Sequence, residues 1–183
     1  MNVKNILPIL VLVLAGCKNE IHTDAQDIAL GNAFIDAFYS FHKDSLQLLL
    51  ASAETSQPEI LYYQKWAECA NYKILDRTKF LKKSDSLLVF PVTVKDDLMK
   101  ALAIDFNVTD TFHILIKHGK IRSVKTSSND VDTYYLAKEW VNKNRPELVA
   151  IPCEGIWNGG PTPCECVLGM IKGFTEFKES QNN

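Results

Sequence analysis

The segment from Asp105 to Lys117 alternates apolar and polar side chains, and this pattern constrains the fold more than any other stretch of the chain. Its even-numbered positions, most of them apolar, are Phe106, Val108, Asp110, Phe112, Ile114 and Ile116. Its odd-numbered positions are polar except for Leu115. Because successive side chains of a β-strand point to opposite faces, the pattern predicts a strand with one buried face and one face toward water. This arrangement is typical of an antiparallel sheet.

The N-terminal segment has the features of a cleaved export signal. One cation, Lys4, precedes an almost wholly apolar run from Ile6 to Ala15. A membrane span needs about 20 apolar residues, and this run is about half that length, as in a secretory signal. It ends in Leu14-Ala15-Gly16-Cys17, which resembles the lipobox of bacterial lipoproteins. The resemblance implies cleavage before Cys17 and attachment of several fatty acyl chains such as palmitate to it, which gives stable membrane anchoring.

We therefore expect residues 1–16 to be a signal peptide, residues 17–23 a tether, and the cell envelope to be the location of the protein. Lys18, not Asp, follows Cys17. By resemblance to Gram-negative sorting signals, this favours the outer membrane, with the protein facing the periplasm. Fully extended, the tether reaches only about 25 Å, so the folded part should stay close to the bilayer.

Export changes the interpretation of the cysteines. With Cys17 lipidated, Cys69, Cys153, Cys164 and Cys166 remain. Four cysteines in an oxidising compartment predict two disulfides. Cys164 and Cys166 lie in one helical turn and meet the geometry of a bridge poorly, so Cys69 and Cys153 should each pair with one of them; which pairs with which stays open. An alternative is a redox-active dithiol at the start of a helix, where the helix dipole lowers a thiol pKa, although the spacing is not C-x-x-C.

Other function classes have little support in the sequence. The net charge is −2, so we expect no nucleic-acid partner. The phosphate-binding G-x-x-x-x-G-K-[ST], the nucleophile motif G-x-S-x-G and the zinc motif H-E-x-x-H do not occur, and we expect no cofactor. The four cysteines lack the paired C-x₂-C spacing of zinc sites, so we expect no metal.

Helical and strand-like periodicities follow one another in blocks. Capping-box patterns at Thr23 with Gln26 and at Ser56 with Glu59, and a cap at Asp44, predict three helices before residue 70. Period-two segments at 72–80, 87–94, 105–117 and 121–126 predict about four antiparallel strands, with turns at Ser84-Asp85 and His118-Gly119 and a bulge or edge position at Pro91. A helix capped by Asp130 and ended by Pro146 should follow, and then a C-terminal helix opened by Thr162 and Glu165.

This order over Asp24 to Ser128 resembles the cone-shaped α+β fold of the nuclear transport factor 2-like superfamily. The resemblance implies N-terminal helices packed on a curved antiparallel sheet, as a domain over residues 24–128. Residues 129–183 would add a helical extension stapled by the disulfides.

The same resemblance implies a ligand in the open end of the cone, in some members with a carboxylate as general base. Asp76 and Asp110 each interrupt an apolar strand face, where burial would raise the carboxyl pKa and suit it to proton transfer. Tyr72 shares the parity of Asp76 and is a candidate ligand-binding residue. Four aromatic residues could instead fill the cone and force binding elsewhere; they are Phe34, Phe38, Phe106 and Phe112.

The leading hypothesis is therefore a lipid-anchored envelope protein with a non-catalytic ligand-binding or scaffolding domain. Its partners would be the membrane, through Cys17, and a small apolar ligand or another envelope protein; the chain would be a monomer or a homodimer. The main alternative is a small enzyme of the isomerase or cyclase kind that uses Asp76 or Asp110, and a weaker one is a thiol-redox protein.

Overall fold

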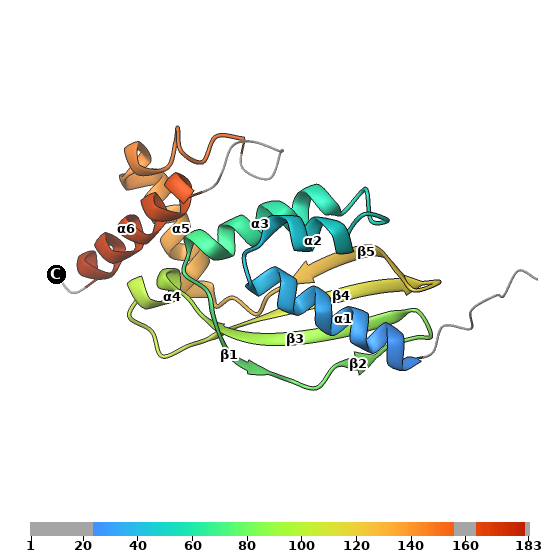
Figure 1. Ribbon diagram of the computed structural model, residues 1–183. Coiled ribbons are helices and arrows are strands. Elements are labelled where there is room, and N and C mark those ends of the chain that lie inside the picture. The colour runs from blue at the N-terminus through green and yellow to red at the C-terminus, as the bar shows by residue number, and fades with distance from the viewer. Residues whose placement is uncertain (1–23, 156–163, 182–183) are drawn as a thin grey trace, which may run out of the picture.

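A computed structural model describes residues 24–155 and 164–181, which form helices around one curved antiparallel sheet (Figure 1). In chain order the elements are α1 (Asp24–Tyr39), α2 (Lys43–Leu49), α3 (Gln57–Cys69), β1 (Lys73–Arg77), β2 (Leu81–Lys82), β3 (Leu87–Lys95), α4 (Asp97–Ala101), β4 (Val108–Lys117), β5 (Lys120–Ser127), α5 (Asp132–Asn144), a 3-10 turn (Pro146–Leu148) and α6 (Cys164–Ser180). The leading helices cover one face of the sheet, and α5 and α6 stand at one end of it. The expected α+β class, with helices on a curved antiparallel sheet and a C-terminal helical segment, is confirmed.

The sheet has the strand order β1-β3-β4-β5, with the short β2 also paired to β3. β3 is therefore an interior strand, and Pro91 within it lies opposite Thr111 of β4. On the other side of β3, β1 pairs with residues 92–95 and β2 with residues 88 and 89. Pro91 thus lies where the neighbouring strand is interrupted, a position in which a residue without an N–H costs little.

The burial of β4 follows the alternation in its sequence. Asp110, Phe112 and Ile114 are buried together with Val108 and Ile116, and the residues between them are half-buried. Phe34 and Phe38 of α1 pack on Phe112, with ring centroids 5.6 and 4.9 Å from its own. Burying each such ring contributes about 1.5–3 kcal/mol. These three rings fill the middle of the sheet's covered face, whereas Phe106 is only partly buried.

The close approach of α1 to the sheet requires a glycine. A Cβ atom at Gly31 would lie 2.2 Å from Cζ of the Phe90 ring. Real Cβ contacts are never so short, so a side chain at Gly31 would displace α1 or the ring. The helix can therefore lie close enough to β3 and β4 to bury its aromatic face.

Several predicted helix starts are wrong in detail. α2 begins at Lys43, after His42, so Asp44 lies inside the helix and is not its cap. Ser56 does precede α3, but its hydroxyl makes no capping bond. It donates to the Ala53 carbonyl at 3.3 Å and accepts from the Val124 N–H of β5 at 3.1 Å, which ties α3 to the edge of the sheet.

Two further helix starts also differ from the prediction. α5 starts at Asp132 with Val131 before it, so Asp130 is not its cap. The connector after β3 contains the short helix α4, which the sequence pattern did not predict. Thr23 and Thr162, which complete two predicted capping boxes, lie outside the described residues.

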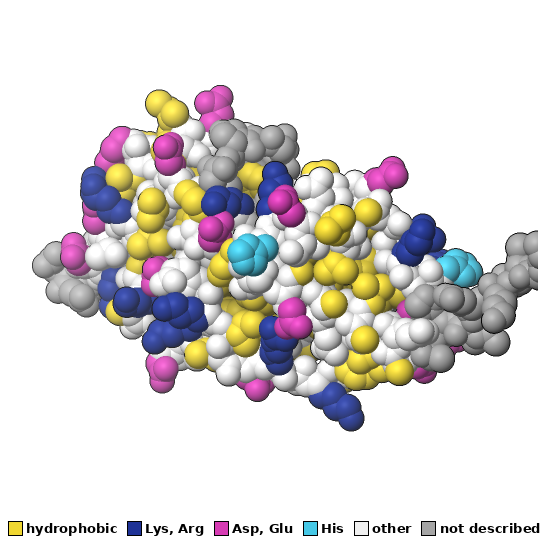
Figure 2. Space-filling model, in the orientation of Figure 1, with side chains coloured by type: hydrophobic (Ala, Val, Ile, Leu, Met, Phe, Trp, Pro, Cys, Tyr) yellow, Lys and Arg dark blue, Asp and Glu magenta, His cyan; other side chains and the backbone are white. Residues whose placement is uncertain are grey.

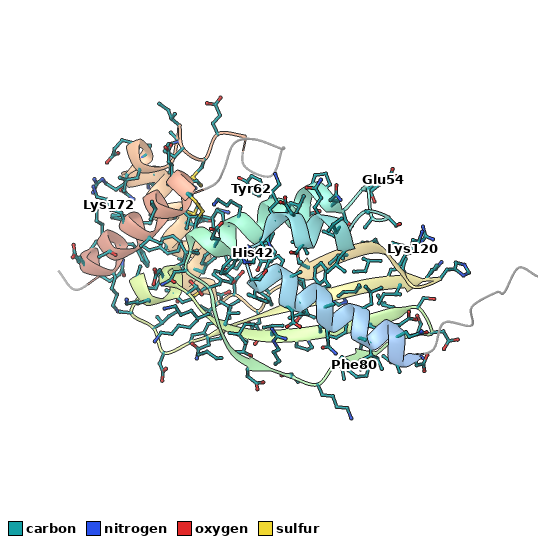
Figure 3. All side chains as sticks on the ribbon, viewed as in Figure 1. His42, Glu54, Tyr62, Phe80, Lys120 and Lys172 are labelled. Carbon is teal, nitrogen blue, oxygen red and sulfur yellow. A yellow bond between two sulfur atoms is a disulfide. The ribbon has the colours of Figure 1, made fainter. Side chains whose placement is uncertain are left out.

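The C-terminal helix is held to the body of the fold by covalent bonds and by packing. Cys69 pairs with Cys164 and Cys153 with Cys166, which confirms two disulfides and selects one of the two pairings left open. In Figure 3 the sulfur atoms lie where α6 begins, beside the end of α3. α6 packs on α3, α4 and α5, and its Phe174 is fully buried. The hydrophobic core therefore runs without a break from the leading helices into α6.

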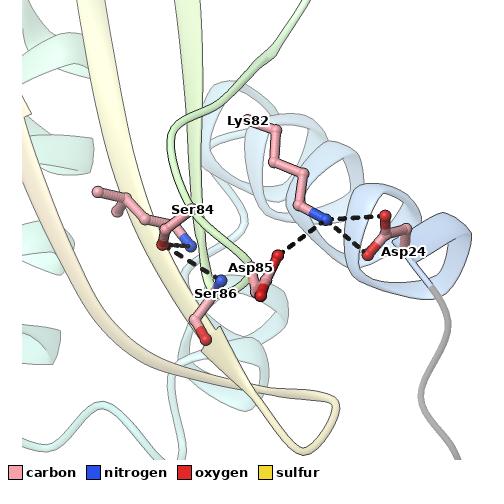
Figure 4. Close-up of polar contacts among 6 residues, drawn as sticks. Asp24, Lys82, Ser84, Asp85 and Ser86 are labelled. Carbon is pink, nitrogen blue, oxygen red and sulfur yellow. Dashed lines mark hydrogen bonds and ion pairs between the residues drawn. The ribbon is translucent and has the colours of Figure 1, made fainter.

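A small charged cluster lies at the end of the molecule where α1 begins (Figure 4). Lys82 Nζ donates to Asp24 Oδ2 at 2.8 Å and lies 3.6 Å from Asp85 Oδ1. The turn beside it is the predicted one, because Ser84 Oγ accepts the N–H groups of Ser86 and Leu87. Exposed ion pairs of this kind contribute about 0–1 kcal/mol, so the cluster positions the start of α1 more than it stabilises the fold.

Acidic, basic and apolar side chains are all present on the face shown in Figure 2. Among residues 24–155 and 164–181, no helix has the length and apolar character needed to span a bilayer.

Candidate functional site

A cavity of about 520 Å³ lies between the end of the sheet and helices α3 to α6. This volume falls within the range of small-molecule sites, about 300–1,000 Å³. Its wall is formed by Glu59, Tyr63 and Trp66 from α3; Tyr72; Asp96, Leu98 and Met99 around α4; Val108 and Asp110 from β4; Thr126, Ser127, Ser128 and Asp130 at and after the end of β5; Tyr134, Lys138 and Asn142 from α5; Cys153; and Met170 from α6.

Asp110 is the most deeply placed charged group of this wall. It lies on the buried face of β4, and its side chain and backbone together are only 1% exposed. Its Oδ1 accepts the hydroxyl of Tyr63 at 2.6 Å, and its Oδ2 accepts the hydroxyl of Tyr39 at 2.8 Å. One carboxylate is thus held by donors from α1 and α3, two helices that pack across the same strand.

Burial raises the pKa of the Asp110 carboxyl to about 6, although hydrogen bonds from Tyr63 and Tyr39 lower it. The neighbouring carboxylates of Asp130 and Asp96 raise the same pKa further. Burial, with proximity to Asp110, also raises the pKa of both Tyr39 and Tyr63 above the ordinary phenol value. The two hydroxyls therefore stay protonated at neutral pH and act as donors to a carboxyl that titrates close to neutrality.

Asp96 is a second buried carboxylate in the wall, and it is only 3% exposed. It caps α4, because its Oδ1 accepts the Met99 N–H at 2.8 Å. Its Oδ2 is buried and has no hydrogen-bond partner among the described residues. Burial raises the pKa of this carboxyl to about 6, and Asp130 and Asp97 raise it further. An unpaired buried acceptor costs about 1–3 kcal/mol, so this oxygen is a place where a ligand could recover free energy.

The rest of the wall is aromatic and acidic. Tyr72 and Tyr134 face the carboxylates: burial, then the carboxylates, raises the pKa of each phenol above its ordinary value. Among the described residues, the charged side chains of the wall are Lys138 and four carboxylates, those of Glu59, Asp96, Asp110 and Asp130. The cavity therefore combines aromatic surface with an excess of negative charge.

Of the three candidate site residues predicted from the sequence, two line the cavity and one does not. Asp110 and Tyr72 both line the cavity. Asp76 does not: it lies exposed on β1, where it accepts the Thr78 hydroxyl at 3.2 Å. The placement of Asp76 on a buried face was wrong because a β-bulge between Ile74 and Asp76 shifts the register. Alternation counted along a strand does not survive an inserted residue.

Sequence reasoning missed most of the partners of Asp110. Tyr39 and Tyr63 have signals in the sequence, since each falls at helical spacing from a buried residue, Ile35 and Ile60 respectively. Nothing local indicates that both reach the same carboxylate, 71 and 47 residues away in the chain. Asp96 had a local signal too, because an aspartate before a short apolar segment is a preferred helix cap.

The structure also shows the state of the four cysteines and the grouping of residues that could bind a metal ion. Cys69, Cys153, Cys164 and Cys166 are all in disulfides, which supports a structural role. Within residues 24–155 and 164–181, no three His, Cys, Asp or Glu side chains gather as a set that could hold a metal ion.

The chain gives no match when it is compared with models of protein families, with curated protein sequences or with solved structures.

Proposed function

We propose that the protein is a lipid-anchored component of the bacterial cell envelope whose cavity binds a small molecule without transforming it. The cavity carries this proposal, and above all the carboxylate of Asp110 held at its wall by Tyr39 and Tyr63. Keeping a carboxylate buried costs free energy, and strongly perturbed carboxyl groups in a concave site are characteristic of functional sites. Leucine in place of Asp110 would extend the apolar face of β4, so the aspartate is better explained by binding than by folding.

The position of the cavity fits anchoring at the N-terminus. The lipobox-like sequence ends at Cys17, and α1 begins at Asp24, at the end of the molecule opposite α5 and α6 (Figure 1). A protein held by that end presents the cavity away from the bilayer, toward soluble ligands. The two disulfides support an oxidising compartment such as the periplasm. The order of elements and the curved sheet support kinship with the nuclear transport factor 2-like superfamily.

Native mass spectrometry of the full chain, extracted from membranes at near-native expression, tests both parts of the proposal. Acylation adds a mass that Cys17→Ala removes. A bound ligand adds a second mass, which should disappear in Thr126→Trp, because that substitution fills the cavity. Lys125→Trp, one residue away and exposed, is the matched control and should keep the ligand. Ligand occupancy that is equal in both tryptophan variants would refute binding in the cavity.

A second candidate function is proton transfer by Asp110. It is favoured by one observation: a buried carboxyl with a pKa raised by burial to about 6 lines a cavity of substrate size. Each oxygen accepts one tyrosine hydroxyl and retains a lone pair for a substrate proton. An enzyme of this kind would incorporate deuterium from D₂O into its ligand, and Asp110→Asn would abolish this while the ligand still binds. If the ligand recovered from the unaltered protein contains no deuterium, proton transfer is refuted and only the binding function remains.

A further inference from the structure

We propose that the cavity takes a protonated organic amine, whose ammonium group lies among the carboxylates of Asp96, Asp110 and Asp130. This inference rests on the proposed function, because it names the chemical class of the ligand for the same cavity. It also changes the ligand expected from the sequence, since an apolar molecule alone would offer no donor to Asp96 Oδ2 and no positive charge to the three carboxylates.

The first observation is the unpartnered oxygen of Asp96. The residue is 97% buried, and only one of its two oxygens is bonded, to the backbone of α4. Its other oxygen, Oδ2, meets no donor among the described residues. An alkylammonium group offers up to three N–H donors and a compensating charge, so it would supply both things that this oxygen lacks.

The second observation is the charge of the wall. Asp130 lies close enough to disfavour ionisation of both Asp96 and Asp110, so the carboxylates repel one another across the cavity. Lys138 lines the same cavity but forms no ion pair with any described residue. A cation bound among the three aspartates would be attracted to each carboxylate and so offset their mutual repulsion. A neutral or anionic ligand would not.

The third observation is the remainder of the wall, which suits the carbon part of an amine. Tyr63, Trp66, Tyr72 and Tyr134 present aromatic surface, and aromatic faces within about 6 Å attract an ammonium group. Leu98, Met99, Val108 and Met170 add apolar surface. A cavity of about 520 Å³ has room for several carbon atoms beside the charged nitrogen, which favours an organic cation.

Three probes of one shape and different charge test the inference: cyclohexylamine, cyclohexanol and cyclohexanecarboxylate. Binding to the full chain in detergent micelles is measured by isothermal titration calorimetry at pH 7.5, which is above the pKa of about 6 of Asp96 and Asp110. We expect cyclohexylamine to bind at least tenfold more tightly than cyclohexanol, and cyclohexanecarboxylate to bind least. N,N,N-trimethylcyclohexylammonium should bind less well than cyclohexylamine, because it has no N–H to offer Asp96 Oδ2.

Variants at two adjacent residues separate charge recognition from structural effects. Asp96→Asn removes the charge but keeps a side-chain oxygen for the Met99 N–H, since asparagine is also a good helix cap. We expect this variant to bind cyclohexylamine about tenfold more weakly and cyclohexanol unchanged. Asp97→Asn, next to it on α4 but outside the cavity wall, should change neither. Asp130→Asn provides a second variant that leaves the helix cap intact and should also weaken amine binding.

The outcomes distinguish this inference from the function on which it rests. Cyclohexanol that binds as tightly as cyclohexylamine, or Asp97→Asn and Asp96→Asn with equal effects, would overturn the amine and leave a cavity that binds other ligands. A mass adduct that depends on the cavity but contains no amine would do the same. No binding of any probe, together with no cavity-dependent adduct, would overturn the proposed function itself.

Discussion

Replacing Asp110 with asparagine should reveal how much free energy the protein spends on a buried carboxylate. Burial raises the pKa of this carboxyl from an ordinary value of 3.8 to about 6, a difference of about 2. One unit corresponds to about 1.36 kcal/mol, so the difference is worth about 3 kcal/mol. The folded state binds the Asp110 proton more tightly than the unfolded state, so protonation of Asp110 adds this amount to the free energy of unfolding. The added stability is complete below about pH 4 and is lost as the pH rises to about 6. Asp110→Asn cannot ionise and should lack this loss.

The measurement is urea unfolding of both proteins, with disulfides intact, at constant ionic strength from pH 3.5 to 8. The free energy of unfolding of Asp110→Asn, relative to the unaltered protein, should rise by about 3 kcal/mol between pH 3.5 and 7. Groups from every packed element act on this carboxyl, namely Tyr39, Tyr63, Tyr72, Asp96 and Asp130. The difference between the two proteins therefore includes any shift that the substitution causes in Asp96.

Asp76→Asn is the control for loss of one carboxylate, because Asp76 is exposed on β1. Its effect should stay within about 0.5 kcal/mol at every pH, as is usual for surface positions. A relative stability of Asp110→Asn that is flat with pH would refute the reasoning. A fall in this relative stability as pH rises toward 4, with no change above that pH, would show that the two tyrosine hydroxyls stabilise the charge by more than burial destabilises it.

Three further substitutions test the contacts around the cavity. Tyr63→Phe leaves the buried carboxylate without one of its two donors, so we expect a loss of about 1–3 kcal/mol in urea unfolding at pH 7.5 and, by NMR titration, a carboxyl pKa above 6; an unchanged pKa would contradict the hydrogen bond. Ser56→Ala removes the acceptor of the Val124 N–H, so amide exchange at Val124 should quicken by more than at neighbouring positions of β5. Replacing Cys69 and Cys164 with serine should lower the free energy of unfolding by about 2–5 kcal/mol, and no change would indicate that packing alone holds α6.

The sequence predicted the part of the site that depends on local periodicity. Asp110 could be placed on the buried face of a strand because Val108, Phe112 and Ile114 on the same face are all apolar, and one register satisfies them together. Tyr72 was chosen for sharing the parity of Asp76 and does line the cavity, although the bulge removes that parity as a reason. Where the local pattern is interrupted, as at Asp76, the same reasoning gave the wrong face.

The rest of the site depends on contacts between distant parts of the chain. The hydroxyls of Tyr39 and Tyr63 converge on Asp110 only because α1 and α3 pack over the sheet at positions that bring both side chains to β4. The position of α1 depends in turn on close packing such as the contact of Gly31 with Phe90. Asp96 became visible as a site residue only when α4 was seen to turn it into the cavity wall. Periodicity assigns a face to a residue, and tertiary packing decides which residues share a cavity.

The C-terminal segment forms one side of the cavity wall and is covalently fixed to the rest of the fold. Tyr134, Lys138, Cys153 and Met170 are among the wall residues that this segment contributes. Cys153 lies in that wall and is bonded to α6, which Cys69 in turn bonds to the end of α3. The wall is therefore fixed in place when the protein folds and oxidises, before any ligand arrives. A wall ordered in advance lowers the entropy cost of binding, so a small ligand can be held by a few directed contacts, here those of the carboxylates.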